Sequence, residues 1–244
     1  MHAPIHRRAG PIPDRGPHTI DISNTSLSPD ADDTVADVDD LGSRSPSTAP
    51  ELRTDRLVLR DWRESDLLPF GELNADPVVM EHFPSTLDAE GTRATVERQR
   101  ARWRDDGMGW WAVEDAATGS FVGAVGLMRV DFAAPFHDVS QPVAEIGWRL
   151  ARSAWGQGYA TEAASASLQW GFDDLRLDEI VSFTVTANQR SRRVMERLGM
   201  VRDPSVDFEH PRVDPDSPLR HHVVYRLRAP GRPGVATPAR HRRE

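Results

Sequence analysis

The stretch "RLARSAWGQGYATEAASA", from Arg149 to Ala166, contains a glycine-rich turn whose meaning depends on the rest of the chain. Two glycines one residue apart, Gly156 and Gly158, follow an apolar segment, and small, helix-forming residues come directly after them. Glycine allows a close backbone approach without a Cβ collision. A strand, a glycine-rich turn and a helix N-terminus together leave free N–H groups at the positive end of the helix dipole. This arrangement predicts an anion site, usually for phosphate.

Two familiar phosphate-binding motifs do not match the stretch. A dinucleotide fingerprint needs a third glycine where Thr161 stands, and an acidic residue ending a strand where Asp178 instead opens one. A phosphate loop needs Lys, but all 30 basic residues of the chain are Arg. The pyrophosphate of coenzyme A is the remaining common ligand of a turn with this geometry.

Composition limits the class of protein. The 244 residues suffice for one domain with tails. A net charge of -8 argues against a protein that coats nucleic acid. The amino terminus lacks the apolar core of a signal peptide, and no run of apolar residues could span a membrane. We therefore expect a cytoplasmic protein without membrane or nucleic-acid partners, either a monomer or a homodimer.

Two tails flank the expected domain. Residues 1–50 are rich in Pro, Ser and Asp, have few apolar residues and show no periodicity, which predicts a disordered acidic tail. Residues 229–244 form a second, basic tail rich in Pro and Gly. The folded domain is expected over residues 51–228.

Hydrophobic periodicity predicts an α/β (α+β) domain with helices on the faces of a mixed sheet. Alternating or β-branched residues predict strands at 56–62, 109–115, 121–130, 143–151, 178–187, 201–208 and 221–228. Helices are expected over 64–76, from a capping box of Ser85 and Asp88 to about 104, from Tyr159 onward, and from Asn188 as N-cap to Gly199.

Four segments together resemble a known superfamily. "AEIGWRLARSAWGQGYATEA" (144–163) and "NQRSRRVMERLGM" (188–200) resemble the two signature segments of the Gcn5-related N-acetyltransferase (GNAT) superfamily. "LRTDRLVLRDWRESD" (52–66) and "NADPVVMEHFP" (74–84) resemble the amino-terminal segment of its RimJ/RimL-like branch. The resemblance covers about residues 51–228. It implies a mostly antiparallel sheet in which two parallel strands, 143–151 and 179–187, splay apart.

The resemblance also implies where acetyl-CoA binds. The pantetheine arm would pair with the backbone between Trp148 and Leu150, and Asn188 and Ser191 would face the thioester end. Arg152 could reach a phosphate. The pyrophosphate would rest on the backbone amides of Gly156, Gln157, Gly158, Tyr159 and Ala160, with Thr161 close by. No metal site is expected.

The implied chemistry is direct aminolysis of a thioester, because the chain has neither Cys nor Lys as a covalent nucleophile. Glu145 is the candidate general base; alternatively it pairs with an Arg or only binds the substrate amine. Relatives often protonate the leaving thiolate with a Tyr at the position of Met195. Here Ser191 is the candidate acid, unless its role is to cap the helix and the thiolate leaves unassisted.

The sequence does not identify the molecule that accepts the acetyl group. It could be a protein or peptide N-terminal amine, or a small-molecule amine. Asp76, Glu81, Asp105 and Asp106 could attract a cationic amine, or they could be solvated surface charges. Two other classes also remain open: a non-catalytic acyl-CoA-binding regulator whose acidic tail docks a partner, and a nucleotide binder that transfers no acyl group.

Overall fold

The computed structural model describes residues 48–137 and 143–231. Apart from residues 48–50 and 229–231, the two expected tails lie outside this part of the chain. Within it, no helix has both the length and the apolar character that crossing a bilayer requires.

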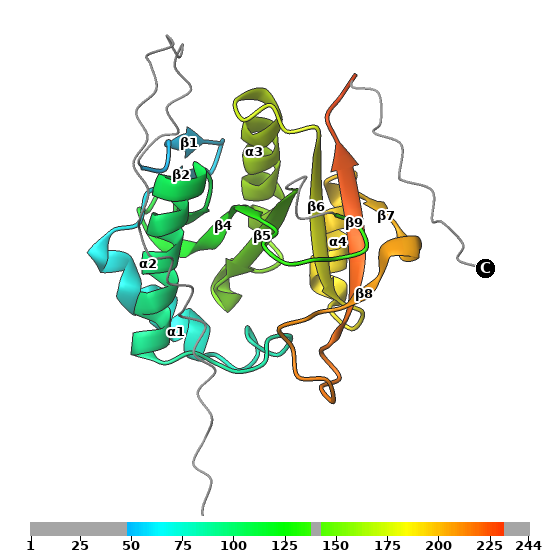
Figure 1. Ribbon diagram of the computed structural model, residues 1–244. Helices are drawn as coiled ribbons and strands as arrows, with labels where there is room; N and C mark the ends of the chain where they lie inside the picture. Colours follow the sequence, from blue (N-terminus) through cyan, green and yellow to red (C-terminus); the bar gives the residue numbers. More distant parts are fainter. Residues whose placement is uncertain (1–47, 138–142, 232–244) are drawn as a thin grey trace, which may run out of the picture. The chain divides into compact units, whose positions relative to one another are not determined.

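A sheet of nine strands forms the centre of the described domain (Figure 1). Its order is β1-β2-β3-β4-β5-β6-β9-β7, with β8 also pairing with β9. Every pairing is antiparallel except that between β5 and β6. The strands are β1 (Leu52–Arg53), β2 (Leu57–Arg60), β3 (Trp110–Asp115), β4 (Phe121–Arg129), β5 (Ala144–Leu150), β6 (Glu179–Val185), β7 (Val201–Arg202), β8 (Phe208–Glu209) and β9 (His221–Arg228).

Helices cover both faces of the sheet (Figure 1). On one face, α1 (Leu67–Ala75) and α2 (Ala89–Asp106) pack on an apolar cluster that includes Trp110 of β3 and Ala124 of β4. On the other, α3 (Tyr159–Asp173) and α4 (Gln189–Arg197) pack on the larger cluster with β4, β5 and β6. Three short 3-10 turns, Glu64–Asp66, Arg152–Ala154 and Pro204–Val206, complete the elements.

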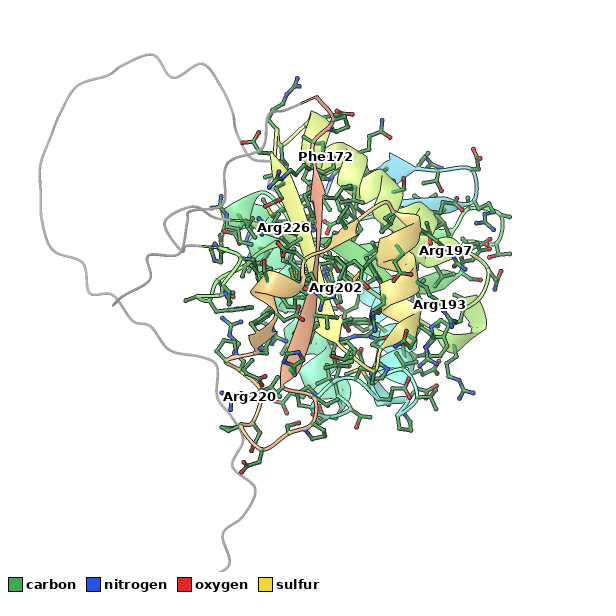
Figure 2. The ribbon with its side chains drawn as sticks, turned by 90° about the vertical axis from the view of Figure 1, so that its right-hand side faces the viewer. Phe172, Arg193, Arg197, Arg202, Arg220 and Arg226 are labelled. Atoms are coloured by element: carbon green, nitrogen blue, oxygen red, sulfur yellow. The ribbon has the colours of Figure 1, made fainter. Side chains whose placement is uncertain are left out.

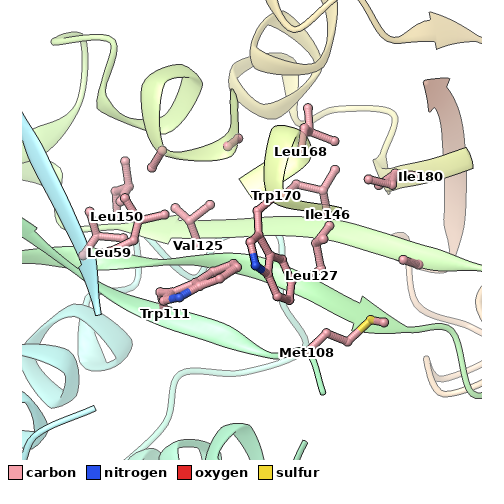
Figure 3. Close-up of a cluster of buried hydrophobic side chains, with 14 of the residues drawn as sticks. Leu59, Met108, Trp111, Val125, Leu127, Ile146, Leu150, Leu168, Trp170 and Ile180 are labelled. Atoms are coloured by element: carbon pink, nitrogen blue, oxygen red, sulfur yellow. The ribbon is translucent and has the colours of Figure 1, made fainter. Parts of the chain in front are cut away.

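The larger core fixes α3 against the strands that lead to the glycine turn. Trp111 of β3 and Trp170 of α3 meet edge to face, with ring centroids 5.1 Å apart (Figure 3). Leu127 and Ile146, from β4 and β5, are fully buried beside them. Aromatic side chains supply large buried areas and a defined mutual geometry. The core therefore holds α3 in a fixed relation to the sheet.

The structure confirms the expected fold, a mixed and mostly antiparallel sheet with one parallel pair and helices on both faces. Asn188 caps α4 as predicted, because its Oδ1 accepts a hydrogen bond from the Ser191 amide at 3.1 Å. Gly199 follows the end of the same helix with a φ of +78°, the conformation of a C-terminal stop.

Two local predictions were wrong. The capping box of Ser85 and Asp88 does not form; α2 starts later, and Asp88 itself is the N-cap, accepting a hydrogen bond from the Gly91 amide at 2.8 Å. The strand expected over 201–208 is broken into β7 and β8. Pro204 lacks an N–H to donate to a ladder and instead opens a 3-10 turn, as proline does at a helix start.

Candidate active site

The only parallel strand pair of the described sheet opens into a V. β5 and β6 pair only where Ala144 faces Ile180 and Glu145 faces Val181, although both strands continue beyond these positions. Ser182 Oγ then donates a hydrogen bond of 2.9 Å to the Ile146 carbonyl, which bridges the start of the opening. Past this bridge the facing backbone edges of the two strands are no longer paired with each other.

The free edge of β5 presents Trp148 and Leu150. In an extended strand, the N–H and C=O of one residue point to the same side, and successive residues alternate. The Ile146 carbonyl points toward β6, so the backbone groups of Trp148 and Leu150 do as well. The Leu150 carbonyl already accepts a hydrogen bond from Trp155 Nε1 at 2.9 Å. Both backbone groups of Trp148 therefore remain for an extended ligand.

The glycine turn lies directly after this edge. Gly156 and Gly158 have φ values of +76° and +83°, a region that L side chains rarely adopt. Gly158 is also the N-cap residue of α3, so the helix starts where the turn ends. A Cβ at Gly156 would meet no heavy atom within 4 Å, which shows open space at this point of the turn.

Two side chains far from the turn in sequence fix its shape. Arg56 donates from Nη1 to the Gln157 carbonyl at 3.0 Å and from Nε to Glu162 Oε2 at 2.8 Å. Thr54 Oγ1 donates to the same carboxylate at 2.6 Å. Burial raises the pKa of Glu162, but the hydrogen bonds from Thr54 and Arg56 outweigh burial and keep that pKa below its ordinary value. The Arg56 guanidinium, held by the charged Glu162 carboxylate, thus ties the turn to the segment between β1 and β2.

A cleft of about 740 Å³ joins the V, the glycine turn and the α2 face of β5. Its α3 side includes Gly156, Gly158 and Ser191, while its α2 side includes Glu145 and Trp110. This volume lies within the range of small-molecule sites, roughly 300–1,000 Å³. Two molecules could therefore enter from opposite faces of the sheet and meet at the opening.

Glu145 lies where such molecules would meet. It is half-buried on β5, on the opposite face from Trp148, and lines the cleft. Burial raises the pKa of Glu145 to about 8, with Arg102 lowering it and Asp131 raising it further. The described residues give its carboxylate no hydrogen bond. A carboxylate whose pKa is close to neutral can take up a proton and release it again, as a general base must.

The start of α4 places Ser191 at the cleft, with its hydroxyl unbonded among the described residues. The Asn188 side chain also reaches the lining, but it is largely used locally: Oδ1 caps the helix, and Nδ2 donates to Thr184 Oγ1 at 3.0 Å. Met195, at the position where relatives often have Tyr, is buried and lines the cleft with a thioether. Ser191 is therefore the hydroxyl that α4 offers to the opening.

Both tyrosines of the chain direct their phenols elsewhere. Tyr159 donates to Asp115 Oδ2 at 2.8 Å, and Tyr225 donates to Glu196 Oε1 at 3.1 Å. The Trp155 ring packs on the larger core and lies under the Arg190 guanidinium, 4.4 Å from its centroid. The side chains of Tyr159 and Trp155 thus hold the turn in place.

Arg152 and the Gln157 side chain are directed away from the cleft. Arg152 pairs with Asp76 at 3.5 Å and does not line the cleft, so the structure gives no support to its predicted contact with a phosphate. Gln157 Nε2 turns back to the Ser153 carbonyl at 2.7 Å, which leaves this residue only its backbone amide for a ligand. Ala160 and Thr161, by contrast, both line the cleft.

Helix α4 contributes cations that the sequence reasoning missed. Arg190, Arg193 and Arg197 line the cleft, and Figure 2 shows the last two on α4. Their spacing, three and then four residues, places them on one face of a helix. That spacing was readable in "NQRSRRVMERLGM" and could have identified them.

For the acidic residues between β2 and β3 the structure favours the second alternative, charges at the surface and not an acceptor wall. The acidic residues between β2 and β3 are held in ion pairs or lie outside the lining: Glu81 pairs with Arg190, and Asp106 with Arg129 at 3.5 Å. The side chains of α2 that do reach the cleft as charges are Arg98 and Arg102. Sequence alone leaves both alternatives open, because it does not show which face of α2 these acids occupy.

His210 and His222 form a packed aromatic group with two phenylalanines. The rings of His210 and His222 are 5.0 Å apart and contact Phe183 and Phe208. Burial, together with His222, lowers the pKa of His210 to about 4. His221 points away and pairs with Glu209 at 2.9 Å. Within the described ranges, no three metal-binding side chains lie close enough to share an ion.

Comparisons with known proteins agree with this geometry. Residues 56–201 match a family model described as an acetyltransferase (GNAT) domain. An uncharacterized protein, YkkB of Bacillus subtilis, is 36% identical over 151 residues, which cover 62% of this chain and 84% of that protein. The FsC-acetyl coenzyme A-N(2)-transacetylase of Aspergillus fumigatus is 31% identical over 62% of this chain and 65% of its own length. The crystal structure of an acetyltransferase from Agrobacterium tumefaciens superposes with a TM-score of 0.59 at 29% identity, covering 74% of this chain and 95% of that one.

Proposed function

Since the chain belongs to the GNAT acetyltransferase family, whose domain uses acetyl-CoA as co-substrate, we propose that it transfers the acetyl group directly to a primary amine held in the cleft at Glu145. The observation that carries this proposal is the V between β5 and β6, which opens between the glycine turn on one face and Glu145 on the other. Within the family, we propose that this chain belongs to the RimJ/RimL-like branch.

The residues fit the co-substrate at three points. Trp148 offers an unpaired backbone N–H and C=O along the opening, as an extended pantetheine arm requires. The turn from Gly156 to Ala160 provides backbone amides at the start of α3 for a diphosphate. We add Arg193 and Arg197 as further phosphate contacts, because both guanidinium groups line the same side of the cleft.

When bound, acetyl-CoA supplies an activated acetyl thioester, in which the amine nitrogen replaces sulfur on the carbonyl carbon. Glu145 takes the proton that the amine loses, directly or through water. Ser191 protonates the departing thiolate, and the proton that Glu145 has taken from the amine returns through water to Ser191, so both side chains end the reaction as they began. One cleft would hold both reactants beside Glu145 and Ser191. Holding two reactants in one geometry contributes much of the rate enhancement, on the order of 7–11 kcal/mol in favourable cases.

A thiol-release assay with acetyl-CoA and a panel of amines tests the proposal. Release that depends on an amine, with a matching mass increase of the acceptor, is the expected result. Protein that binds CoA but acetylates no amine would instead be the non-catalytic acyl-CoA-binding regulator. Thermal stabilisation by CoA, and not by NAD or ATP, is expected at the same time; stabilisation by ATP alone would point to a nucleotide binder.

A further inference from the structure

The acceptor side of the cleft holds cations that the described residues do not neutralise. Arg98 and Arg102 lie one helical turn apart on α2, and Arg149 lies on β5; all three line the cleft. No ion pair joins any of them to a carboxylate within the described ranges. Arg102 influences Glu145 electrostatically, without a hydrogen bond between them.

The other charged groups on this side are paired. Arg129 pairs with Asp106 at 3.5 Å, and Arg212 pairs with Asp131 at 2.8 Å. Their charges therefore largely cancel at the rim of the cleft. The excess positive charge is concentrated on α2 and on β5, beside Glu145.

Neutral partners hold Arg149 in place without cancelling its charge. Nη1 donates to Asn74 Oδ1 at 2.7 Å, and the guanidinium lies 4.3 Å from the centroid of the Phe83 ring. Its Nε is buried and has no partner within the described residues, and the same is true of Trp110 Nε1 in the adjoining lining. Buried donors without acceptors are costly, and sites with such donors favour a ligand that supplies acceptors.

The electrostatics of this wall point the same way. Burial, with Arg98 adding to it, lowers the pKa of Arg149 to about 10, so its charged form is held at a cost. Burial and Arg102 also lower the pKa of Arg98. A negative group between these side chains would reverse both effects, and a carboxylate accepts paired hydrogen bonds from guanidinium groups.

We propose that the acceptor is a small amine that also carries a carboxylate, as an amino acid does, and that Arg98, Arg102 and Arg149 bind that carboxylate while its amine faces Glu145. This inference rests on the proposed function and narrows it to one substrate class. The carboxylate and the amine would both lie in the cleft that Arg102 and Glu145 line. Polyamines are disfavoured, since a second ammonium group would meet the same arginines.

Matched pairs of acceptors test the inference. Phenylalanine and methionine are compared with their carboxamides, and spermidine is added as a polycation. We expect kcat/KM at least tenfold higher for each acid than for its amide, because a paired carboxylate–guanidinium contact contributes roughly this much to binding. The amine of the amide is less basic than that of the acid, so a larger fraction of it is neutral. If only the concentration of neutral amine mattered, the amide would react faster than the acid. Amides or spermidine that react as fast as the acids would overturn the inference and leave acetyl transfer standing.

Variants locate the effect. Arg98→Gln and Arg102→Gln should each reduce the preference for acid over amide several-fold, mainly by raising KM for the acid. Arg104→Gln is the matched control, because Arg104 is exposed on the same helix and does not line the cleft. A purely structural role for Arg98 and Arg102 would lower the rates for acid and amide equally and would contradict the assignment.

A binding measurement separates the two proposals. In the presence of saturating CoA, phenylalanine should raise the melting temperature of the protein more than phenylalaninamide does, and Arg102→Gln should remove the difference. If no amine in the panel is acetylated but this difference is seen, the proposed reaction fails while the carboxylate site stands. Equal shifts for acid and amide would overturn the carboxylate site.

Discussion

Arg56 and Glu162, 106 positions apart in the sequence, are joined by a side-chain hydrogen bond of 2.8 Å from Nε to Oε2. A second hydrogen bond runs from the Arg56 amide to Oε1 at 3.0 Å. Because Arg56 also donates to the Gln157 carbonyl, this residue connects the segment just before β2 to both the glycine turn and α3. The Gln157 carbonyl is thereby held toward Arg56, which fixes the backbone of the turn at this residue.

Glu162→Gln should therefore weaken CoA binding several-fold and lower stability by about 1–2 kcal/mol, the usual effect of losing hydrogen bonds to a charged group. Isothermal titration with CoA and urea unfolding measure the two effects. Arg53→Gln is the control, because its pair with Glu51 is exposed and such pairs contribute little. A Glu162→Gln protein with wild-type CoA affinity would contradict the view that this contact shapes the turn.

Gly158→Val should reduce CoA affinity at least tenfold while the fold persists. The Cβ itself would fit, since its nearest contact, Arg56 Nη2, is 3.5 Å away. The φ of +83° is the obstacle, because a β-branched residue pays roughly 1–3 kcal/mol there and the turn relaxes to avoid it. Titration with CoA, together with circular dichroism of the free protein, gives the answer.

The matched control for that variant is Gly119→Val. Gly119 has a φ of +72°, and a Cβ there would meet no heavy atom within 4 Å, but this glycine lies in the turn between β3 and β4. Both variants should lose similar stability, and only Gly158→Val should lose CoA affinity. Equal CoA affinities in the two variants would refute the assignment of the glycine turn to the co-substrate.

The sequence was sufficient for the fold because its strongest signals are local. The alternation in β3, β4 and β9, the cap at Asn188 and the glycine at 199 each act within one element or turn. Where a predicted element did not form, another local preference of the sequence prevailed. Pro204, for example, has no N–H to donate and interrupts the strand expected over 201–208. The candidate site was predicted from one motif, the glycine turn.

The composition of the acceptor wall could not be predicted in the same way. Whether Arg102 or Asp105 of α2 faces the cleft depends on how the helix is rotated on the sheet, which its weakly patterned and highly charged sequence leaves open. The long-range contact between Arg149 and Asn74 likewise could not be predicted, because neither local sequence contains a signal for the other residue. The sequence shows how many charges α2 carries, but not which of them face the cleft.

The pH dependence of catalysis should report Glu145. Burial raises its pKa to about 8, and the groups facing it are Arg102 of α2, which opposes this, and Asp131 beyond β4, which adds to it. A base works only when deprotonated, so kcat/KM should fall as the pH drops below about 8. Glu145→Gln should lower the rate by about 10²–10⁴-fold and remove this ionisation from the profile. Glu97→Gln, on the exposed side of α2, should keep the wild-type profile; an unaltered profile in Glu145→Gln would exclude Glu145 as the base.

The same residue should make stability depend on pH in the opposite sense. A carboxyl whose folded pKa is raised binds its proton more tightly in the folded protein, so stability falls as pH rises from the unfolded pKa of about 4.5 to about 8. Glu145→Gln should therefore be more stable than the wild type at about pH 8, by about 1 kcal/mol or more, and nearly equal to it at about pH 4.5. Urea unfolding at both pH values measures this. A constant difference across the range would indicate that the pKa of Glu145 is not raised by folding.

Ser191→Ala separates a proton donor from a helix cap. The capping hydrogen bond uses the backbone amide of Ser191 and Oδ1 of Asn188, so it survives when the hydroxyl is removed. If the hydroxyl protonates the leaving thiolate, kcat should fall by about 10²-fold with little change in CoA affinity or melting temperature. Asn188→Ala is the complementary variant, and it should cost about 1 kcal/mol of stability because it removes the cap. A Ser191→Ala enzyme with the wild-type kcat would mean that the thiolate leaves without help from this hydroxyl, and the chemical step would then depend on Glu145 and on the positioning of the two reactants alone.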